Sequence, residues 1–544
     1  MQPTLQLFTA QNGMLSAKAF FSDGTSRHIH SLVDPAVESV FYENLNFWGD
    51  LIIFEGIGLG YHVVPKISTI PKQAKIIVIE YFDELIENCR TKIFDKIDNE
   101  IVYVSASTLP EVKSFVLSIF RNNSGLKAQI VRHVASIFVC RQFYETAINE
   151  LIPKIPGTVP DKSPVRALIF YGNFFLEEEI RNALIANDVE PVLFRYNELK
   201  KGIAFEDKLQ QILVGQRPNF ILSINMKGFD GNGALEDISF RLCIPVIVWF
   251  VDDPRPILMH RLNFVKGNMF AACWEKTYLP YLEKSGFCKA QHVPLATDEK
   301  LFYRPDFSLP QIDTGFVGTS MVDSRAGNIK EKFLWSDNLM PLVERMSDML
   351  LDDPYFVVEK NIAVYAEKMS VKIPFSDLKN ITWLSSYCIH TASMKKRKKI
   401  IGSLVYDGIV LFGDPEGWKI LLGEKISARP NIDYRHDLRD IYRDIKINVN
   451  ITSCQMPAAV NQRVFDVPCS GSFVISDDQK DMHELFDVGN DAIVYESPED
   501  LREKTKFYLS HDYLRLSIVS KARNRILNEH TYTIRIRSIL QMLK

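Results

Sequence analysis

The sequence predicts an α/β protein with parallel, doubly wound sheets, and three observations carry this prediction. Short apolar strands alternate with helices along most of the 544 residues, an order typical of parallel sheets. Glycine-rich turns follow three of the strands, at Gly56, Gly318 and Gly413. Residues 152–164 contain four prolines and one glycine, which is typical of a linker, and the strand–helix order starts again after them.

This order predicts three α/β domains. We expect a Rossmann-like domain over residues 1–151, the linker over 152–164, further α/β domains over 165–308 and 309–525, and a C-terminal helix over 526–544. In such sheets ligands bind outside the carboxyl ends of the strands. Two adjoining domains of this kind are typical of an enzyme with a cleft between them.

The composition is that of an ordinary globular protein, with 46% hydrophobic and 24% charged residues. A net charge of -3 gives no general attraction to nucleic acid or to an anionic membrane. The eight cysteines form no CxxC pair, which argues against a zinc site and a disulfide framework and favours the reducing cytoplasm. No apolar run approaches the ~20 residues of a membrane span, so we expect no transmembrane segment.

The N-terminal domain begins with a small β-rich segment, residues 1–45. A buried strand then leads into a glycine-rich turn, and a second strand, Lys75–Glu80, ends in an acid. This is the nucleotide-binding Rossmann order, in which the terminal acid holds a ribose diol. The candidate residues of this possible second site are Gly56, Gly58, Gly60 and Glu80.

The N-terminal pattern departs from both known fingerprints. A dinucleotide motif starting at Gly56 would need glycine where Tyr61 stands. A methyltransferase-like motif would need an acid at Phe54, whereas the acid is Glu55. Two interpretations therefore stay open: a site for S-adenosylmethionine or a dinucleotide, and a structural or acceptor-recognition domain without a cofactor.

In the second domain an acidic pair follows a buried strand. Residues 245–251 are apolar, and Asp252, Asp253 and Pro254 come directly after them. The pair could contribute to a cleft without a metal, or bind Mg²⁺ together with substrate phosphates. Alternatively, one aspartate caps the next helix, which would start with Pro254, while the other orients a neighbour.

The third domain opens with the strand Gly315–Val317 and a tight turn. Gly318 lets the backbone approach a ligand closely, and Thr319 follows it. A later strand, Gly408–Phe412, ends in Gly413-Asp414. Between the two, the basic run 395–399 is interpreted as a solvated helix face rather than a binding patch.

The stretch Ile447–Gly471 combines a buried strand, a polar loop and a helix. Arg463 and Asp466 are three residues apart, so they share one helix face. The planar fork of arginine suits a diphosphate, helix N-termini attract phosphate, and aspartate can accept from sugar hydroxyls. The stretch therefore predicts a nucleotide-sugar site, with an ordinary surface ion pair as the alternative.

From about residue 165 to the end, these pieces resemble the CgeB-type (spore-maturation) family of glycosyltransferases. That family belongs to the GT-B class, which has two Rossmann-like domains with a cleft between them. The matching pieces, in order, are Trp249…Asp252-Asp253-Pro254, Phe316-Val317-Gly318, Phe412-Gly413-Asp414, Asn461-x-Arg463-x-Phe465-Asp466…Cys469-x-Gly471 and His530-Thr531-Tyr532-x-x-Arg535.

The resemblance implies a cytoplasmic, metal-independent transferase without a further cofactor. It would move a sugar from a UDP-, GDP- or dTDP-sugar to a protein or cell-surface glycan. Phosphates would meet the turn after the third-domain strand, the base or sugar would meet the segment from Gly413 to Trp418, and the ribose would meet Asp466. The implied donor residues are Gly318, Thr319, Gly413, Asp414, Trp418, Asn461, Arg463, Asp466 and Gly471.

The resemblance also assigns the chemistry and exposes one departure. Arg463 would neutralise the leaving diphosphate, and an inverting enzyme would take its base from Asp252 or Asp253. Many retaining relatives have glutamate at the position of Asp466 and another at the position of Ala459, so retaining and inverting chemistry both stay open. Two alternatives are a non-catalytic nucleotide-sugar-binding scaffold and an S-adenosylmethionine-dependent enzyme centred on the N-terminal domain.

Overall fold

The fold is taken from a computed structural model of the chain. It describes residues 3–543, except for 44, 122–126, 153–163, 173–175, 197–202, 260, 306–308, 323–336 and 375. The predicted linker therefore lies almost wholly outside the described residues. In the described part, no helix combines the length and apolar character needed to cross a membrane.

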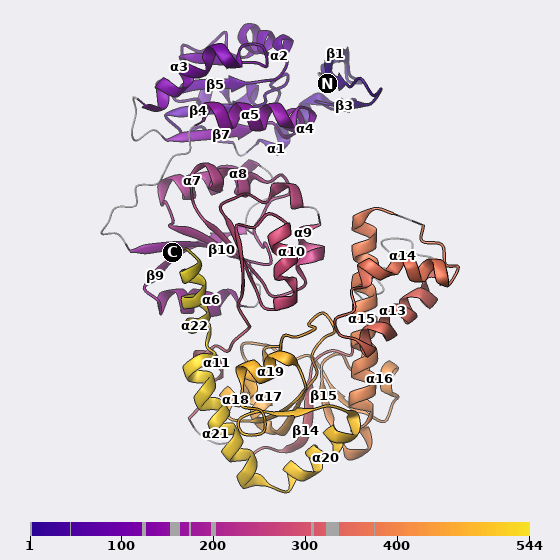
Figure 1. Cartoon of the computed structure of the whole chain (residues 1–544). Coiled ribbons are helices and arrows are strands. Elements are labelled where there is room, and N and C mark those ends of the chain that lie inside the picture. Colours follow the sequence, from indigo (N-terminus) through magenta and orange to yellow (C-terminus); the bar gives the residue numbers. More distant parts are fainter. Residues whose placement is uncertain are drawn as a thin grey trace. The chain divides into compact units, whose positions relative to one another are not determined.

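The N-terminal part contains a small antiparallel sheet and a parallel one (Figure 1). The antiparallel strands are β1 (Thr4–Thr9), β2 (Leu15–Phe20) and β3 (Ser26–His28). The parallel sheet has the order β6-β5-β4-β7, with β4 (Leu51–Glu55), β5 (Lys75–Ile79), β6 (Ile101–Val104) and β7 (Ala128–Arg132). The helices α1 (Glu38–Phe41), α2 (Asp83–Asn88), α3 (Leu109–Arg121), α4 (Val134–Val139) and α5 (Arg141–Leu151) accompany it. The β-rich start and the Rossmann-like order are both confirmed.

A second sheet of six strands has the order β13-β12-β11-β10-β8-β9. Every residue of β10 and β11 is buried, as is typical of strands covered on both faces. Its strands are β8 (Val165–Tyr171), β9 (Val189–Arg195), β10 (Phe220–Ile224), β11 (Val246–Phe250), β12 (Met269–Cys273) and β13 (Lys289–His292). Its helices include α6 (Glu177–Ile185), α7 (Ile203–Gly215), α8 (Ala234–Arg241), α9 (Pro254–Leu258), α10 (Leu279–Lys284) and α11 (Glu299–Phe302).

The third sheet is fully parallel, with the order β16-β15-β14-β17-β18-β19. Its strands are β14 (Ile312–Val317), β15 (Val410–Phe412), β16 (Ser427–Arg429), β17 (Ile445–Asn450), β18 (Phe473–Asp477) and β19 (Ile493–Tyr495). The edge strand β16 is absent from the sequence prediction because it has only three residues and two of them are polar.

Helices connect the strands of the third sheet. The long helix α15 runs from Leu378 to Gly402, and α18 follows β17 directly. The last two helices are separate, because α21 ends at Glu529 and Thr531 caps α22. The helices are α13 (Met340–Asp352), α14 (Val358–Lys368), α15 (Leu378–Gly402), α16 (Pro415–Leu422), α17 (Leu438–Asp444), α18 (Arg463–Ser470), α19 (Lys480–Leu485), α20 (Pro498–Leu509), α21 (Asp512–Glu529) and α22 (Tyr532–Leu540).

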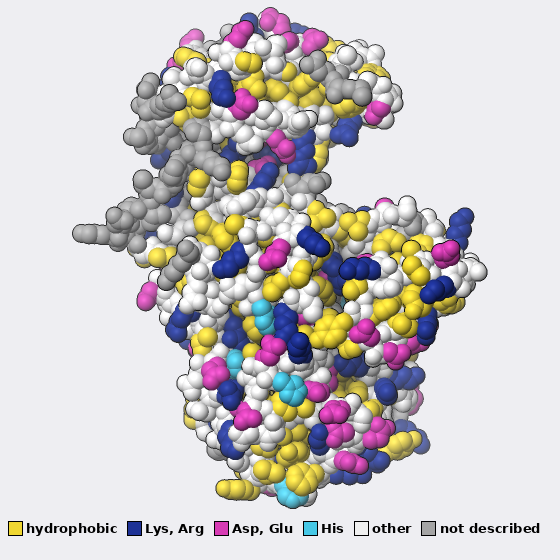
Figure 2. Space-filling model, viewed as in Figure 1, with side chains coloured by type: hydrophobic (Ala, Val, Ile, Leu, Met, Phe, Trp, Pro, Cys, Tyr) yellow, Lys and Arg dark blue, Asp and Glu magenta, His cyan; other side chains and the backbone are white. Residues whose placement is uncertain are grey.

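The chain is thus an α/β protein with several Rossmann-like parallel sheets, as the sequence predicts. It forms two compact units: one comprises Met1–Asn173, Val192–Ile221 and Gly228–Val246, and the other comprises Phe174–Pro191, Leu222–Lys227 and Ile247–Lys544. The predicted domain boundaries stay predictions. On the face drawn in Figure 2, cationic and anionic side chains are interspersed, in keeping with the small net charge.

Candidate functional site

The Gly318 turn (residues 318–320) follows β14 and packs tightly against the end of β15. The Gly318 amide donates to the Phe412 carbonyl at 2.7 Å. A side chain at Gly413 would place its Cβ 2.3 Å from the Gly318 carbonyl oxygen, so this position requires glycine. Thr319 is exposed, and the turn therefore opens to solvent.

Asp414 and Trp418 form hydrogen bonds with this turn. The two Asp414 carboxylate oxygens accept from the Ser320 amide and hydroxyl at 2.5 and 2.6 Å. The Trp418 indole N–H donates to the Gly318 carbonyl at 3.1 Å, and the ring is buried against Phe316. Both residues support the backbone of the turn, and their predicted contact with a base or sugar stays a prediction.

Two arginines meet at the same turn. Arg463 begins α18, and its guanidinium lies 5.4 Å from the centre of the Phe316 ring. Arg397, on α15, lies 5.7 Å from the same ring and donates to the Thr319 carbonyl. A Cβ at Gly318 would lie 2.9 Å from Nη2 of Arg463, so glycine leaves room for that guanidinium.

The two guanidiniums bring positive charge together; Asp414 and Asp477 act on Arg397 through their charge, in the direction that raises its pKa, without a direct contact among the described residues. Burial and then the charge of Arg463 lower the pKa of Arg397 to about 9, which leaves it cationic at neutral pH. Within the described part of the chain, neither arginine forms an ion pair; their polar contacts are carbonyl, hydroxyl and amide oxygens. Like charges held this close favour an anion between them, and the guanidinium fork matches phosphate geometry.

Arg397 was not predicted from the sequence, where the basic run was interpreted as a solvated face. Lys398 and Lys399 are indeed exposed, but Arg397 is only 8% exposed. A signal was available: Arg397 precedes the buried Ile400 and Ile401 by three and four residues, and this spacing puts it on the buried face of α15.

Asn461 and Asn450 orient Arg463. The side-chain oxygen of Asn461 accepts from the Arg463 amide at 3.1 Å, and its amide group donates to Oδ1 of Asn450 at 2.8 Å. The same Asn450 oxygen lies 3.4 Å from Nη1 of Arg463. Asn461 therefore acts on Arg463 through hydrogen bonds at the start of α18.

The structure places the last two predicted donor residues away from this surface. Asp466 is 2% exposed and accepts from the Thr297 hydroxyl at 2.7 Å. Burial raises the pKa of Asp466 well above its usual range. Gly471 caps the opposite end of α18 at φ +95°, about 12 Å along the helix from Arg463. Neither arrangement adds support for donor binding by these residues.

The acidic pair after β11 has separate partners. Asp253 caps α9 by accepting from the Arg255 amide at 3.0 Å, and it also receives the Arg255 guanidinium. Arg255 in turn donates to Glu359 at 2.7 Å. Asp252 accepts from Asn225 at 2.8 Å. The capping alternative thus describes Asp253, and a catalytic role for either residue stays a prediction.

In the N-terminal part, the Gly56 turn (residues 56–60) is wholly buried. The oxygen Oε2 of Glu80 accepts from the Ile57 and Gly58 amides at 3.0 and 2.9 Å. Its other oxygen accepts from the Tyr144 hydroxyl at 2.7 Å. The carboxylate predicted to hold a ribose is therefore fully buried and engaged by the protein itself.

The glycines of this turn fit against protein side chains rather than open space. All three have positive φ, and a Cβ at Gly56 would lie 2.7 Å from Cβ of Ser136. At Gly58 it would lie 2.4 Å from Nε2 of His30, and at Gly60 it would lie 2.2 Å from Ile93. The cofactor site at Gly56, Gly58, Gly60 and Glu80 stays a prediction that this closed arrangement does not favour.

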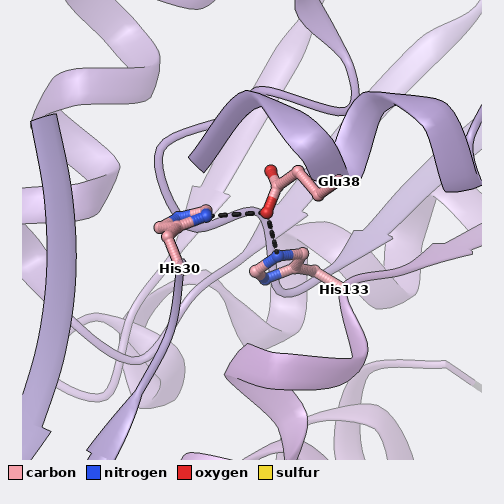
Figure 3. A group of neighbouring side chains, drawn as sticks. All are labelled: His30, Glu38 and His133. Atoms are coloured by element: carbon pink, nitrogen blue, oxygen red, sulfur yellow. Dashed lines mark hydrogen bonds and ion pairs between the residues drawn. The ribbon is translucent and has the colours of Figure 1, made fainter. Parts of the chain in front are cut away.

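Beside this turn, Glu38 and three histidines form what we call the histidine cluster: His30, His62, His133 and Glu38. His30 Nδ1 lies 2.7 Å from Oε2 of Glu38, and His133 Nε2 lies 3.3 Å from the same oxygen (Figure 3). His62 Nδ1 lies 3.3 Å from the other oxygen. All three imidazoles are buried, and Glu38 sits between them.

Hydrogen-bond partners fix the proton positions in this cluster. The Leu59 amide donates to Nε2 of His30 at 2.8 Å, so that nitrogen carries no proton. The proton of neutral His30 is then on Nδ1, where it donates to Glu38. A metal-bound histidine instead donates from its second nitrogen, and Leu59 offers a donor there. Although His30, Glu38 and His133 are close enough to hold an ion, this donor set does not fit one.

A cavity of about 410 Å³ borders the loop after β17, and its lining does not include Arg397 or the Gly318 turn. Its charged residues are three lysines and three acids, so the charge of the lining indicates no particular ligand. The lining residues are Asp348, Leu350, Leu351, Asp352, Pro354, Lys395, Lys396, Lys399, Ile400, Cys454, Met456, Gln479, Glu496 and Pro498.

Comparisons with known proteins find a family match in the C-terminal part and several similar solved structures. Residues 388–541 match the family described as "Glycosyl transferase-like". Among solved structures, a glycosyltransferase from Rickettsia africae ESF-5 is similar (11% identity, TM-score 0.40, 70% of this chain and 98% of that chain). Sucrose-phosphate synthase from Thermosynechococcus elongatus is also similar (10% identity, TM-score 0.40, 70% of this chain and 99% of that chain). A third similar structure is Anabaena Alr3699/HepE in complex with UDP (9% identity, TM-score 0.38, 70% of this chain and 99% of that chain).

A comparison with curated proteins finds no match. The family match includes both Arg397 and Arg463. Over residues 388–541 this α/β chain is therefore similar to glycosyltransferases.

Proposed function

We propose that the protein is a nucleotide-sugar-dependent glycosyltransferase of the CgeB type. The observation that carries the proposal is the pair of guanidiniums of Arg397 and Arg463, which meet at the Gly318 turn without an ion-pair partner among the described residues. A diphosphate is the part of a UDP-, GDP- or dTDP-sugar that would neutralise both charges. The match of residues 388–541 to glycosyl transferase-like proteins supports the same assignment.

In the proposed reaction, the bond between the sugar's anomeric carbon and the diphosphate oxygen breaks. A hydroxyl oxygen of a protein or glycan acceptor bonds to that carbon and gives up its proton. Positive charge develops on the sugar and negative charge on the departing diphosphate. Arg397 and Arg463 lie where that negative charge would form, so they stabilise the transition state without a metal ion.

The surrounding residues have supporting roles in this proposal. The absence of a side chain at Gly318 allows the phosphate to approach the guanidinium of Arg463. Asn461 and Asn450 hold that guanidinium in position. Asp252 is the better candidate for the base, because Asp253 already caps α9 and pairs with Arg255.

The proposal places the enzyme in the cytoplasm, where thiols stay reduced. All eight cysteines are unpaired, which agrees with such a compartment.

Calorimetric titration with UDP, GDP and dTDP tests the proposal. One nucleotide should bind, and Arg463→Ala and Arg397→Ala should each weaken it roughly 10- to 100-fold, the size of a charge-assisted hydrogen bond of ~1.5–3 kcal/mol. Lys398→Ala is the matched control, since Lys398 is the exposed neighbour of Arg397.

Turnover is measured as release of the free nucleoside diphosphate from the matching nucleotide sugar. It should be lost in parallel with affinity in the two arginine variants. Full binding and turnover in both would refute the proposal, and binding without turnover in the unmodified protein would indicate a scaffold.

A further inference from the structure

The histidine cluster holds the Gly56 turn closed through one backbone bond. His30 accepts the Leu59 amide on Nε2 and donates to Glu38 from Nδ1. Its ring also lies where any side chain at Gly58 would be, 2.4 Å from the Cβ position. His30 therefore joins three segments of the N-terminal part: its own loop, the glycine turn and α1.

A second proton on His30 is incompatible with this arrangement. Because Nδ1 already carries a proton, the added proton must go to Nε2. That nitrogen would then be a donor facing the Leu59 amide, which is also a donor. The bond cannot persist, and either the imidazole or the turn has to move.

The charged groups around His30 also oppose the uptake of several protons by the histidine cluster. Among the described residues, Glu38 is the carboxylate paired with His30, and Glu80, which is already bound to the turn, acts on His30 through its charge. The rings of His133 and His30 are 5.1 Å apart, and those of His133 and His62 are stacked at 4.8 Å. A single carboxylate can balance one imidazolium, so further protons on this stack repel one another.

We propose that the histidine cluster is a proton-operated latch, which keeps the Gly56 turn closed at neutral pH and releases it when His30 is protonated. Release frees the Leu59 amide and removes the ring that lies against Gly58. The Ile57 and Gly58 amides stay bound to Glu80. Acidification therefore opens the second half of the turn and leaves its first half in place.

Hydrogen exchange of single backbone amides, corrected for the intrinsic rate at each pH, tests the latch in the full-length protein. Between pH 7.5 and 5.0 the protection of the Leu59 amide should fall by up to roughly 30-fold for each histidine that takes up a proton on opening, tenfold per pH unit below about pH 6.5. The Ile57 and Gly58 amides in the same protein should lose clearly less protection, because their bonds to Glu80 do not depend on His30. Equal loss at all three amides, or no loss at Leu59, would overturn the proposal.

Two variants isolate His30. Gln in His30→Gln can still accept the Leu59 amide but does not titrate, so the pH response at Leu59 should fall by the share of one histidine, while His62 still titrates. His28→Gln is the control, because His28 is an exposed histidine on the neighbouring strand β3, and it should behave as the unmodified protein does. A pH response as large in His30→Gln as in the unmodified protein would assign the effect to another group.

A control for metal binding completes the test. Exchange at Leu59 is measured with EDTA and with added zinc at pH 7.5. The latch predicts no change with either. A change in protection would mean that the cluster holds a cation, and the latch would then be wrong.

Discussion

The Gly56 turn and the Gly318 turn occupy equivalent positions, each at the carboxyl end of a parallel strand, yet their donors are used differently. At the Gly56 turn, the Ile57, Gly58 and Leu59 amides all have protein acceptors, Glu80 and His30. At the Gly318 turn, two guanidiniums have no ion-pair partner in the described part of the chain, and Thr319 is exposed. A ligand site thus depends less on the turn than on whether its donors are left for a ligand.

The strongest test of this difference removes both guanidiniums. Arg397→Ala combined with Arg463→Ala should reduce nucleoside diphosphate affinity by at least about 100-fold, since two charge-assisted bonds of ~1.5–3 kcal/mol each are lost. Isothermal titration measures this directly. Glu80→Gln, at the other turn, is the comparison and should bind as the unmodified protein does. Equal weakening by Glu80→Gln would mean that the nucleotide binds at the Gly56 turn instead.

The second prediction removes the acceptor that fills the Gly56 turn. Glu80→Ala leaves the Ile57 and Gly58 amides and the Tyr144 hydroxyl buried without their partner. The N-terminal sheet should lose roughly 3 kcal/mol of stability, since each orphaned buried group costs ~1–3 kcal/mol.

Urea unfolding followed by exchange of the β4 and β5 amides measures this loss. Glu84→Ala, an exposed acid on α2, is the control and should leave stability unchanged. Were the two variants equally stable, the bonds to Glu80 would contribute nothing net.

The elements that could be predicted from the sequence are those whose signal is local. The strands predicted at Lys75–Glu80 and Gly408–Phe412 agree with β5 and β15 to within two residues, because apolar runs mark them directly. The turn at Gly318 was also placed correctly after its strand. Local signals fail where a residue's partner is distant in sequence. Arg397 donates to the carbonyl of Thr319, which lies 78 residues earlier in the chain. The spacing of residues in a basic run indicates a buried helix face but does not identify that partner.

The Gly56 turn also has partners that are distant in sequence and could not be predicted. Its glycine-rich turn and the acid at Glu80 are similar to a nucleotide site, although the spacing departs from the known fingerprints, and the fold around them was predicted. The closed turn also involves Tyr144, which donates to Glu80, and His30, which accepts from the Leu59 amide. Both residues come from other parts of the domain. Sequence spacing shows that a donor set exists, but not whether the protein already occupies it.

The third prediction uses pH, to which the two turns should respond differently. Burial lowers the pKa of His62 to about 4 and also lowers that of His30, whereas in the unfolded chain both are near 6.5. Between pH 6.5 and 4 the unfolded state therefore binds more protons, so the stability of the N-terminal part falls as pH falls. The expected slope is up to ~1.4 kcal/mol per pH unit for each histidine.

Chemical denaturation at pH 7.5, 6 and 5 checks this slope. His62→Gln should reduce it, because the variant has one titrating group fewer. His28→Gln, at the exposed histidine of β3, serves as the comparison, because buried His530 in the C-terminal part also has a pKa lowered to about 4. A slope in His62→Gln equal to that of the unmodified protein would contradict the assignment to the histidine cluster.

The smallest expected effect concerns the support behind the Gly318 turn. Trp418→Phe removes the indole N–H that donates to the Gly318 carbonyl and keeps an aromatic ring against Phe316. Trp249→Phe is a matched control, because its buried indole also donates to one carbonyl, that of Val293, at the same 3.1 Å. Each should cost about 1 kcal/mol of stability, the net value of one hydrogen bond.

Only Trp418→Phe should also weaken nucleotide binding, by roughly threefold, because a carbonyl released at Gly318 lets the turn move away from Arg463. Equal affinity in the two variants would show that Asp414, which holds Ser320 through two bonds, fixes the turn without the indole. The Gly318 turn would then resemble the Gly56 turn in one respect, since a single carboxylate would determine the shape of each.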